Sequence, residues 1–113
     1  DSTSKILTDA MALAFIKRGF NVSIDENIVI QSGLTEEIRN KLASAKINAV
    51  VIVNAMITRP FISKKMALSA NMYDVRNGNL LWSANVVEFE LDEINKVVEK
   101  MVDTISPKRE TGE

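Results

Sequence analysis

The sequence predicts an α/β fold, a two-layer or three-layer sandwich in which three helices pack on a mostly antiparallel sheet of about four strands, in the order αβαβββα. Two observations predict this class. Apolar residues recur at helical spacing in three segments, and the segments between them alternate or carry runs of β-branched residues. The 113 residues, 46% hydrophobic and 26% charged, contain no internal repeat or linker. We therefore expect one domain over residues 1–113 with a substantial core.

The first helix is predicted over Ser4–Arg18, where apolar residues recur three and four positions apart. Gly19 follows as a residue suited to the left-handed position after a helix. Phe20 can then fold back on Phe15, the hydrophobic contact that accompanies a Schellman motif. This end of the helix is well defined by sequence.

Strands are predicted on both sides of a second helix. Phe20–Ile24 alternates weakly as a short strand, and Asn27–Gly33, which follows it, has no decided pattern. The helix begins after Thr35, whose hydroxyl can cap it, and runs to about Lys46, with its charges placed as the helix dipole favours. The β-branched run Ala49–Val53 then predicts a central strand that is covered on both faces.

A β-hairpin is predicted next. Lys65–Tyr73 alternates with a period of two, and Leu80–Glu90 is the returning strand. Asn77 and Gly78 lie between them, and an Asn-Gly pair predicts a two-residue type I′ turn with positive φ at both positions.

The third helix is predicted from Asp92, its capping residue, to a stop at Pro107. We expect the polar tail 107–113 to be flexible. The apolar stripe of this helix comprises Ile94, Val97, Val98, Met101 and Ile105.

The turn fixes the pairing of the hairpin strands. If Asn77 and Gly78 are the whole loop, Tyr73 lies opposite Trp82. The same register pairs Asn71 with Ala84, Ala67 with Glu88 and Lys65 with Glu90. The opposite, apolar face would pack against helices and holds Met66, Leu68, Met72, Leu81, Val87 and Phe89.

Tyr73, Trp82 and Asn71 are the candidate partner-binding residues, because this predicted face mixes aromatic rings that carry polar tips with polar side chains. Such a composition is typical of a surface that is wet when alone and covered on binding. The alternative is that Tyr73 and Trp82 form a cross-strand pair that only stabilises the hairpin.

The residue counts exclude most catalytic devices. The chain has no His and no Cys, which removes the usual general base, the thiolate nucleophile and the common zinc ligands. With 14 basic and 15 acidic residues, the net charge of −1 creates no field that would attract nucleic acid. We therefore expect no catalytic residues, no metal and no cofactor.

Two groups of charged residues could be given a chemical role, and a structural explanation is favoured for each. Glu88 and Glu90 share one side of a strand, but a solvated strand end paired with Lys65 is favoured over an acid–base pair. Acidic residues that alternate with lysines on the third helix are favoured as a solvated face rather than as metal ligands, namely Asp92, Glu93, Glu99 and Asp103.

The segment Ala67–Ser83 resembles a strand-turn-strand of bacterial envelope proteins, with an apolar strand, then Asp74, an Asn-Gly turn and a Trp-Ser pair. It is similar to the hairpin of curli-secretion proteins of the CsgG type, of LpoB-type lipoprotein activators of penicillin-binding proteins, and of the TolB amino-terminal domain. Upstream, the Gly-Phe step after the first helix and the strand start Ile47–Val51 also fit. Asn48 stands where these families often have Gly.

The resemblance implies a non-enzymatic protein-interaction domain of a bacterial envelope lipoprotein that assists envelope assembly or secretion. It implies a location in the periplasm or at the periplasmic face of the outer membrane. The expected partner is another envelope protein or a second copy of the chain, not nucleic acid. A membrane would be contacted only through a lipid anchor outside these residues, since no lipobox Cys is present. The alternative is a small-molecule-binding module or a small enzyme of unknown substrate.

Overall fold

The computed structural model describes residues 2–24, 34–59 and 65–105. Within these residues the elements are α1 (Ser2–Lys17), α2 (Glu36–Ser44), β1 (Ala49–Arg59), β2 (Lys65–Asp74), β3 (Leu80–Glu90), the 3₁₀ turn η1 (Leu91–Glu93) and α3 (Ile94–Val102). The strands form one antiparallel sheet in the order β1-β2-β3. The predicted α/β class is confirmed, with three strands in the described residues rather than about four.

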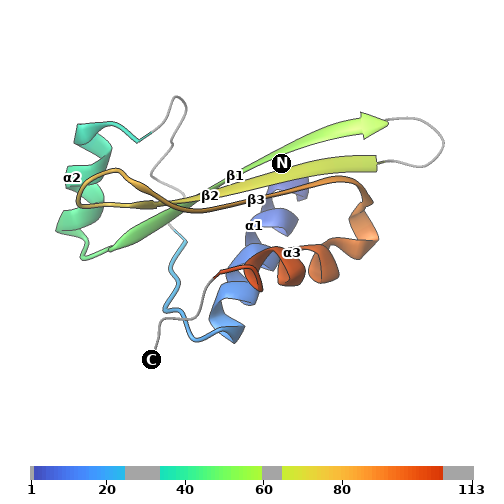
Figure 1. The fold of residues 1–113 in the computed structure, drawn as a ribbon, viewed down its shortest axis with the longest axis horizontal. Coiled ribbons are helices and arrows are strands. Elements are labelled where there is room, and N and C mark those ends of the chain that lie inside the picture. Colours follow the sequence, from blue (N-terminus) through green and yellow to red (C-terminus); the bar gives the residue numbers. More distant parts are fainter. Residues whose placement is uncertain (1, 25–33, 60–64, 106–113) are drawn as a thin grey trace.

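The sheet has one covered face. Figure 1 shows α1 and α3 together on one side of the sheet, with α2 at one end. We call the side facing α1 and α3 the inner face and the opposite side the outer face. The core lies between the inner face and the two helices, and its most buried large side chains include Met66, Leu68, Val98 and Val102. Two ion pairs, Lys17–Glu99 at 2.9 Å and Arg18–Asp103 at 3.0 Å, connect the end of α1 to α3.

The predicted end of α1 is confirmed. Gly19 has a φ of 93°, and the Phe20 N–H donates to the Phe15 carbonyl at 3.1 Å, which is the long hydrogen bond of a Schellman motif. The rings of Phe15 and Phe20 meet edge to face with their centroids 5.2 Å apart. The sequence therefore specified this helix end through local contacts.

The predicted strand Phe20–Ile24 is wrong, because the segment has no regular secondary structure. Phe20 and Val22 pack against the core without pairing to a strand, so the weak alternation reflects burial of alternate side chains beside α1. The segment Asn27–Gly33, the predicted stop at Pro107 and the tail 107–113 lie outside the described residues.

The capping of α2 is confirmed, since the Ile38 N–H donates to Thr35 Oγ1 at 3.2 Å. The helix also ends in a Schellman pattern, in which the Ile47 N–H donates to the Leu42 carbonyl at 3.0 Å. Lys46 occupies the left-handed position with a φ of 63°. A residue with a Cβ is therefore held where glycine is favoured.

β1 begins at Ala49 as predicted and extends to Arg59. The prediction of a central strand is wrong for the sheet that the described residues form, because β1 lies at its edge. Val51 and Val53 pack against the core only in part.

The hairpin turn differs from the type I′ prediction. The Gly78 N–H donates to the Asp74 carbonyl at 2.7 Å, and the Asp74 N–H donates to the Asn79 carbonyl at 2.8 Å. The loop therefore has four residues, Val75–Gly78. Gly78 has a φ of 77°, whereas Asn77 does not have positive φ. Asn77 instead accepts the Asn79 N–H at 2.8 Å through Oδ1, so its side chain stabilises the loop without entering the left-handed region.

The longer loop shifts the register of the hairpin. Trp82 lies opposite Met72, not Tyr73, and Asn71 lies opposite Ser83, not Ala84. A further irregularity near Ala67 inserts one more residue into β3, where Glu88 has a φ of 59°. The two irregularities return the strands to the predicted pair Lys65–Glu90, which is confirmed.

The register change reassigns residues between the faces of the sheet. Met66, Leu68, Met72 and Phe89 are buried as predicted. Leu81 and Val87 are not, with 54% and 71% of their surface exposed, because each lies at an irregularity of β3. Trp82 takes their place in the core.

α3 shows the predicted apolar stripe but not the predicted cap. The helical turn begins one residue before Asp92, at Leu91. The Glu90 N–H donates to Glu93 Oε1 at 3.1 Å, so the capping contact comes from Glu93. The predicted stripe faces inward, with Ile94, Val98 and Met101 buried and with Val97 and Ile105 partly buried.

Candidate functional site

The predicted partner-binding residues lie on opposite faces of the sheet. Along β2 the even-numbered residues are buried and the odd-numbered residues are half-buried, so Asn71 and Tyr73 point to the outer face. Trp82 lies opposite the buried Met72 and points inward. The prediction that Tyr73 and Trp82 share a face is therefore wrong.

Trp82 is a core residue with a fixed orientation. Only 9% of its surface is exposed, and its ring meets Phe15 edge to face with centroids 5.8 Å apart. The indole Nε1–H donates to Thr104 Oγ1 at 2.8 Å, and the Thr104 hydroxyl donates to the Met101 carbonyl at 2.7 Å. This side chain joins β3 to α1 and to the end of α3.

Tyr73 lies between residues of the two neighbouring strands on the outer face. It is directly opposite Val50 on β1 and Leu80 on β3. Val50 is half-buried, whereas 55% of the Leu80 surface is exposed. Tyrosine is enriched in protein interfaces, and the exposed leucine beside it adds apolar surface.

Asn71 adds a polar group beside Tyr73. Ser83 Oγ donates to Asn71 Oδ1 at 2.7 Å across the strands. This bond orients the Asn71 amide and leaves its N–H groups as donors that an incoming chain can use. We call Tyr73, Asn71, Leu80 and Ser83 together the Tyr73 surface.

α2 and the hairpin loop border this surface at one end of the sheet (Figure 1). Arg39 Nη1 donates to the Arg76 carbonyl at 3.0 Å. A Cβ on Gly78 would lie 3.7 Å from the Arg39 side chain, so the guanidinium lies over the loop. The sequence did not indicate that Arg39 lies over the loop or that Leu80 lies beside Tyr73. The position of Arg39 depends on the tertiary packing of α2, and that of Leu80 depends on the length of the hairpin loop.

Asp74 and Arg76 form an ion pair within the loop. Arg76 Nη2 lies 3.1 Å from Asp74 Oδ2, and the Arg76 backbone N–H donates to Asp74 Oδ1 at 2.8 Å. Hydrogen bonds from the Arg76 side chain and backbone lower the pKa of Asp74 below its usual value, and the same pair raises the pKa of Arg76. Asp74 therefore stays ionised and compensates the charge of Arg76.

Several of the acidic residues that the sequence suggested for chemistry have structural partners. Glu90 pairs with Lys65 at 3.2 Å, while Glu99 pairs with Lys17 and Asp103 with Arg18. In the described part of the chain, no cluster of acidic residues could hold a metal ion. None of the helices described is both long and apolar enough to cross a membrane.

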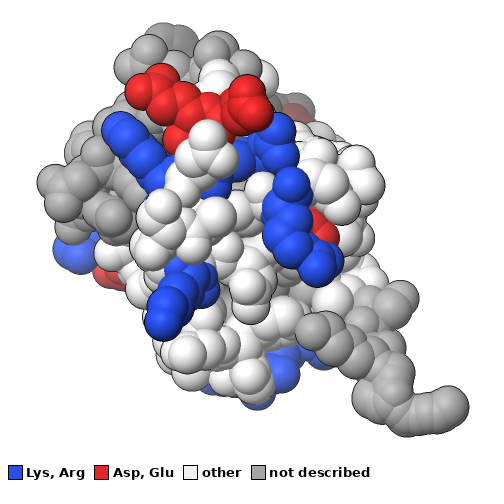
Figure 2. Space-filling view, turned by 90° about the vertical axis from the view of Figure 1, so that its left-hand side faces the viewer, with Lys and Arg blue, Asp and Glu red and all other residues white. Residues whose placement is uncertain are grey.

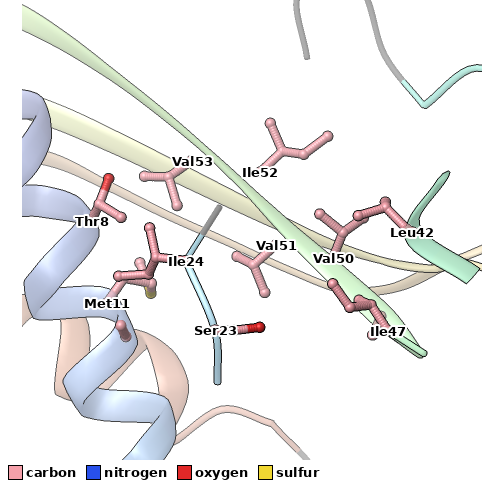
Figure 3. Close-up of a pocket in the computed structure, with 12 residues that line it drawn as sticks. Thr8, Met11, Ser23, Ile24, Leu42, Ile47, Val50, Val51, Ile52 and Val53 are labelled. Carbon is pink, nitrogen blue, oxygen red and sulfur yellow. The ribbon is translucent and has the colours of Figure 1, made fainter. Parts of the chain in front are cut away.

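A groove of about 300 Å³ follows the edge of β1 (Figure 3). It is lined by Ala49–Val53, by α1, by Ser23 and Ile24, and by Leu42 and Ile47. None of its lining residues is charged, and only Thr8 and Ser23 carry a polar side chain. This volume is at the lower end of the range for small-molecule sites.

Comparisons with protein families, with curated proteins and with solved structures found no match for this chain. The resemblance of Ala67–Ser83 to the CsgG, LpoB and TolB families stays a prediction from sequence.

Proposed function

We propose that this chain is a non-enzymatic protein-interaction domain whose partner binds the Tyr73 surface. The observation that carries the proposal is the difference between the two faces of the sheet. The inner face is covered by α1 and α3, whereas the Tyr73 surface combines an aromatic ring, an exposed leucine and amide donors on the outer face. Trp82 has no direct part in this proposal, because it is buried in the core.

The partner that we propose is another protein of the bacterial envelope, and the proposed location is the periplasm or the periplasmic face of the outer membrane. The support is the resemblance of the hairpin, including Asp74, the Asn-Gly step and the Trp-Ser pair, to envelope families. A lipid anchor outside these residues belongs to the same proposal.

Site-specific cross-linking tests the proposal. A photoreactive phenylalanine replaces Tyr73 in one sample and Lys96, an exposed residue of α3, in a matched control. Both proteins are irradiated in an envelope fraction of the source bacterium. We expect one defined partner to be captured from position 73 and not from position 96, and the purified partner to bind the wild-type chain.

Tyr73→Ala should weaken binding of that purified partner by about tenfold or more, since an anchoring aromatic contributes about 2 kcal/mol. Equal capture from both positions, or full binding by a correctly folded Tyr73→Ala protein, would contradict the proposal.

The β1 groove favours one alternative, a module that binds a small apolar molecule. A ligand there should raise the melting temperature in proportion to its occupancy. Val51→Trp, which fills the groove from a residue that lines it, should abolish that rise. A panel of apolar metabolites that leaves the melting temperature unchanged would count against this alternative.

A further inference from the structure

We infer that the Tyr73 surface binds an acidic segment of its partner, with apolar side chains on Tyr73 and Leu80 and with carboxylates beside Arg39, Lys41 and Lys46. We call these three cations the cationic end. The inference names the partner chemistry and rests on the proposed function.

Positive charge gathers at the end of the molecule where α2 meets the hairpin. Figure 2 views this end and shows Lys and Arg side chains around an uncharged central area, with Asp and Glu confined mainly to one border. Arg39 and Lys41 lie on α2, and Lys46 follows its last turn. The cationic end therefore borders the end of the sheet that holds Tyr73.

The cationic end is not neutralised by ion pairs within the described residues. Arg39, Lys41 and Lys46 take part in none of the ion pairs found there. Arg76 lies nearby but is neutralised by Asp74 at 3.1 Å, so it is not counted among these cations. An incoming carboxylate would therefore find charge without first breaking an internal pair.

Arg39 is held in place without losing its charge. Its Nη1 donates to a neutral acceptor, the Arg76 carbonyl, and its side chain lies over Gly78. The remaining guanidinium donors match the planar geometry of a carboxylate. Because this side chain is already ordered, binding costs little additional conformational entropy.

The cationic end and the Tyr73 surface are connected through α2. Leu42 and Val50 line the same groove (Figure 3), and Val50 lies directly opposite Tyr73. Arg39 and Lys41 are three residues and one residue before Leu42, so they flank this buried side chain around the helix. Arg39 also lies against Gly78, two positions before Leu80. A segment lying on Tyr73 and Leu80 would therefore reach the cationic end at Arg39.

Within the described residues, the acidic residues of α2 form no ion pair with the three cations of the cationic end. Glu36 and Glu37 lie in the first turn of α2, where the helix dipole stabilises them. At the other end of the outer face, Lys65 and Glu90 neutralise each other at 3.2 Å. An acidic segment would therefore bind in one direction, with its carboxylates toward α2.

Two matched peptides test the inference. One hexapeptide alternates leucine with glutamate, and the other alternates leucine with lysine. Each is titrated into the isotopically labelled full chain and followed by amide chemical shifts, at about 0.01 M and about 0.15 M salt, between which the screening length falls from about 30 Å to about 8 Å.

We expect the glutamate peptide to shift the amides of Tyr73, Leu80 and Arg39, to bind more weakly at the higher salt, and to bind better than the lysine peptide. Lys41→Gln should weaken its binding about threefold and Arg39→Gln about fivefold. Lys96→Gln on α3 is the control and should change nothing. Arg39→Gln removes a hydrogen bond to the hairpin loop and could change the loop itself. Lys41→Gln has no such effect, because the Lys41 side chain makes no hydrogen bond or ion pair with the described residues.

Equal binding of the two peptides, or shifts confined to other residues, would overturn the inference. If position 73 still captures a partner in that case, the charge preference is wrong and the proposed function stands. If position 73 captures no partner, the proposed function fails, and this inference fails with it.

Discussion

Tyr73 and Trp82 are the two polar-tipped aromatic residues of the hairpin, and they serve opposite faces of the same sheet. The Trp82 ring packs on Phe15 in the core, and its indole N–H donates a hydrogen bond to Thr104. Tyr73 lies between Val50 and Leu80 on the outer face. A shift of one residue in the pairing separates these roles. In a sheet with one buried and one outer face, the loop length therefore decides which aromatic ring packs in the core and which can contact a partner.

The largest expected effect on stability comes from removing the Trp82 side chain, which packs in the core. Trp82→Ala should lower the free energy of unfolding by about 3–5 kcal/mol, because it leaves a cavity beside Phe15 and removes the hydrogen bond to Thr104. Tyr73→Ala should cost about 1 kcal/mol or less. Urea denaturation of both proteins measures the contrast, and equal losses would mean that the two faces do not differ as described.

The loop that separates the faces is the next place to test. Gly78→Val should lower the free energy of unfolding by about 1–2 kcal/mol, because a β-branched residue is strained at a φ of 77°. Asn77→Ala, which removes only the hydrogen bond to the Asn79 N–H, should cost about 1 kcal/mol or less. A larger loss for Asn77→Ala than for Gly78→Val would contradict the four-residue loop.

Just after α2, which borders the outer face, one residue is held in a strained backbone conformation that a substitution can relieve. Lys46→Gly should raise the free energy of unfolding by about 0.5–1 kcal/mol, because glycine takes the left-handed conformation freely. At α1 the equivalent position is already Gly19, so Gly19→Ala should destabilise. Thermal denaturation measures both changes, and a destabilised Lys46→Gly protein would count against the Schellman end of α2.

The smallest effect concerns the pH dependence of the loop. The pKa of Asp74 is lower in the folded chain than its usual value of 3.8, chiefly because of hydrogen bonds from Arg76. Its stabilising contribution is therefore complete above pH 3.8 and is lost as the pH falls through the folded pKa. Asp74→Asn should lack this part of the acid destabilisation. Identical stability profiles below pH 4 for the two proteins would show that the Arg76 contact has no effect on folding.

The features that sequence predicted correctly are those decided by local contacts. Gly19 with Phe20 ends α1, and Thr35 caps α2, because each signal acts within about five residues. The two-residue turn was predicted wrongly, because an Asn-Gly pair suits the last two positions of a four-residue loop as well as it suits a two-residue loop. The irregularities that bring Trp82 and Phe89 inward depend on packing against α1 and α3, which local sequence does not encode.

The candidate site was only partly predictable for the same reason. The alternation of β2 correctly placed Asn71 and Tyr73 on one face. Trp82 was assigned to that face through the wrong turn. Arg39 was missed because its contact with Arg76 joins residues 37 positions apart in the chain.

The central claim is that the inner face folds the protein and the outer face binds its partner. The most direct test measures, for Tyr73→Ala and Trp82→Phe, both the free energy of unfolding and the affinity for the partner captured through position 73. The account predicts that Tyr73→Ala keeps its stability within about 1 kcal/mol and loses about tenfold or more in affinity. The Trp82→Phe protein should be less stable than the wild type. Under conditions in which it is folded, it should bind the partner as tightly as the wild type does. The reverse pattern, with binding lost by a stable Trp82→Phe protein and kept by Tyr73→Ala, would contradict the claim.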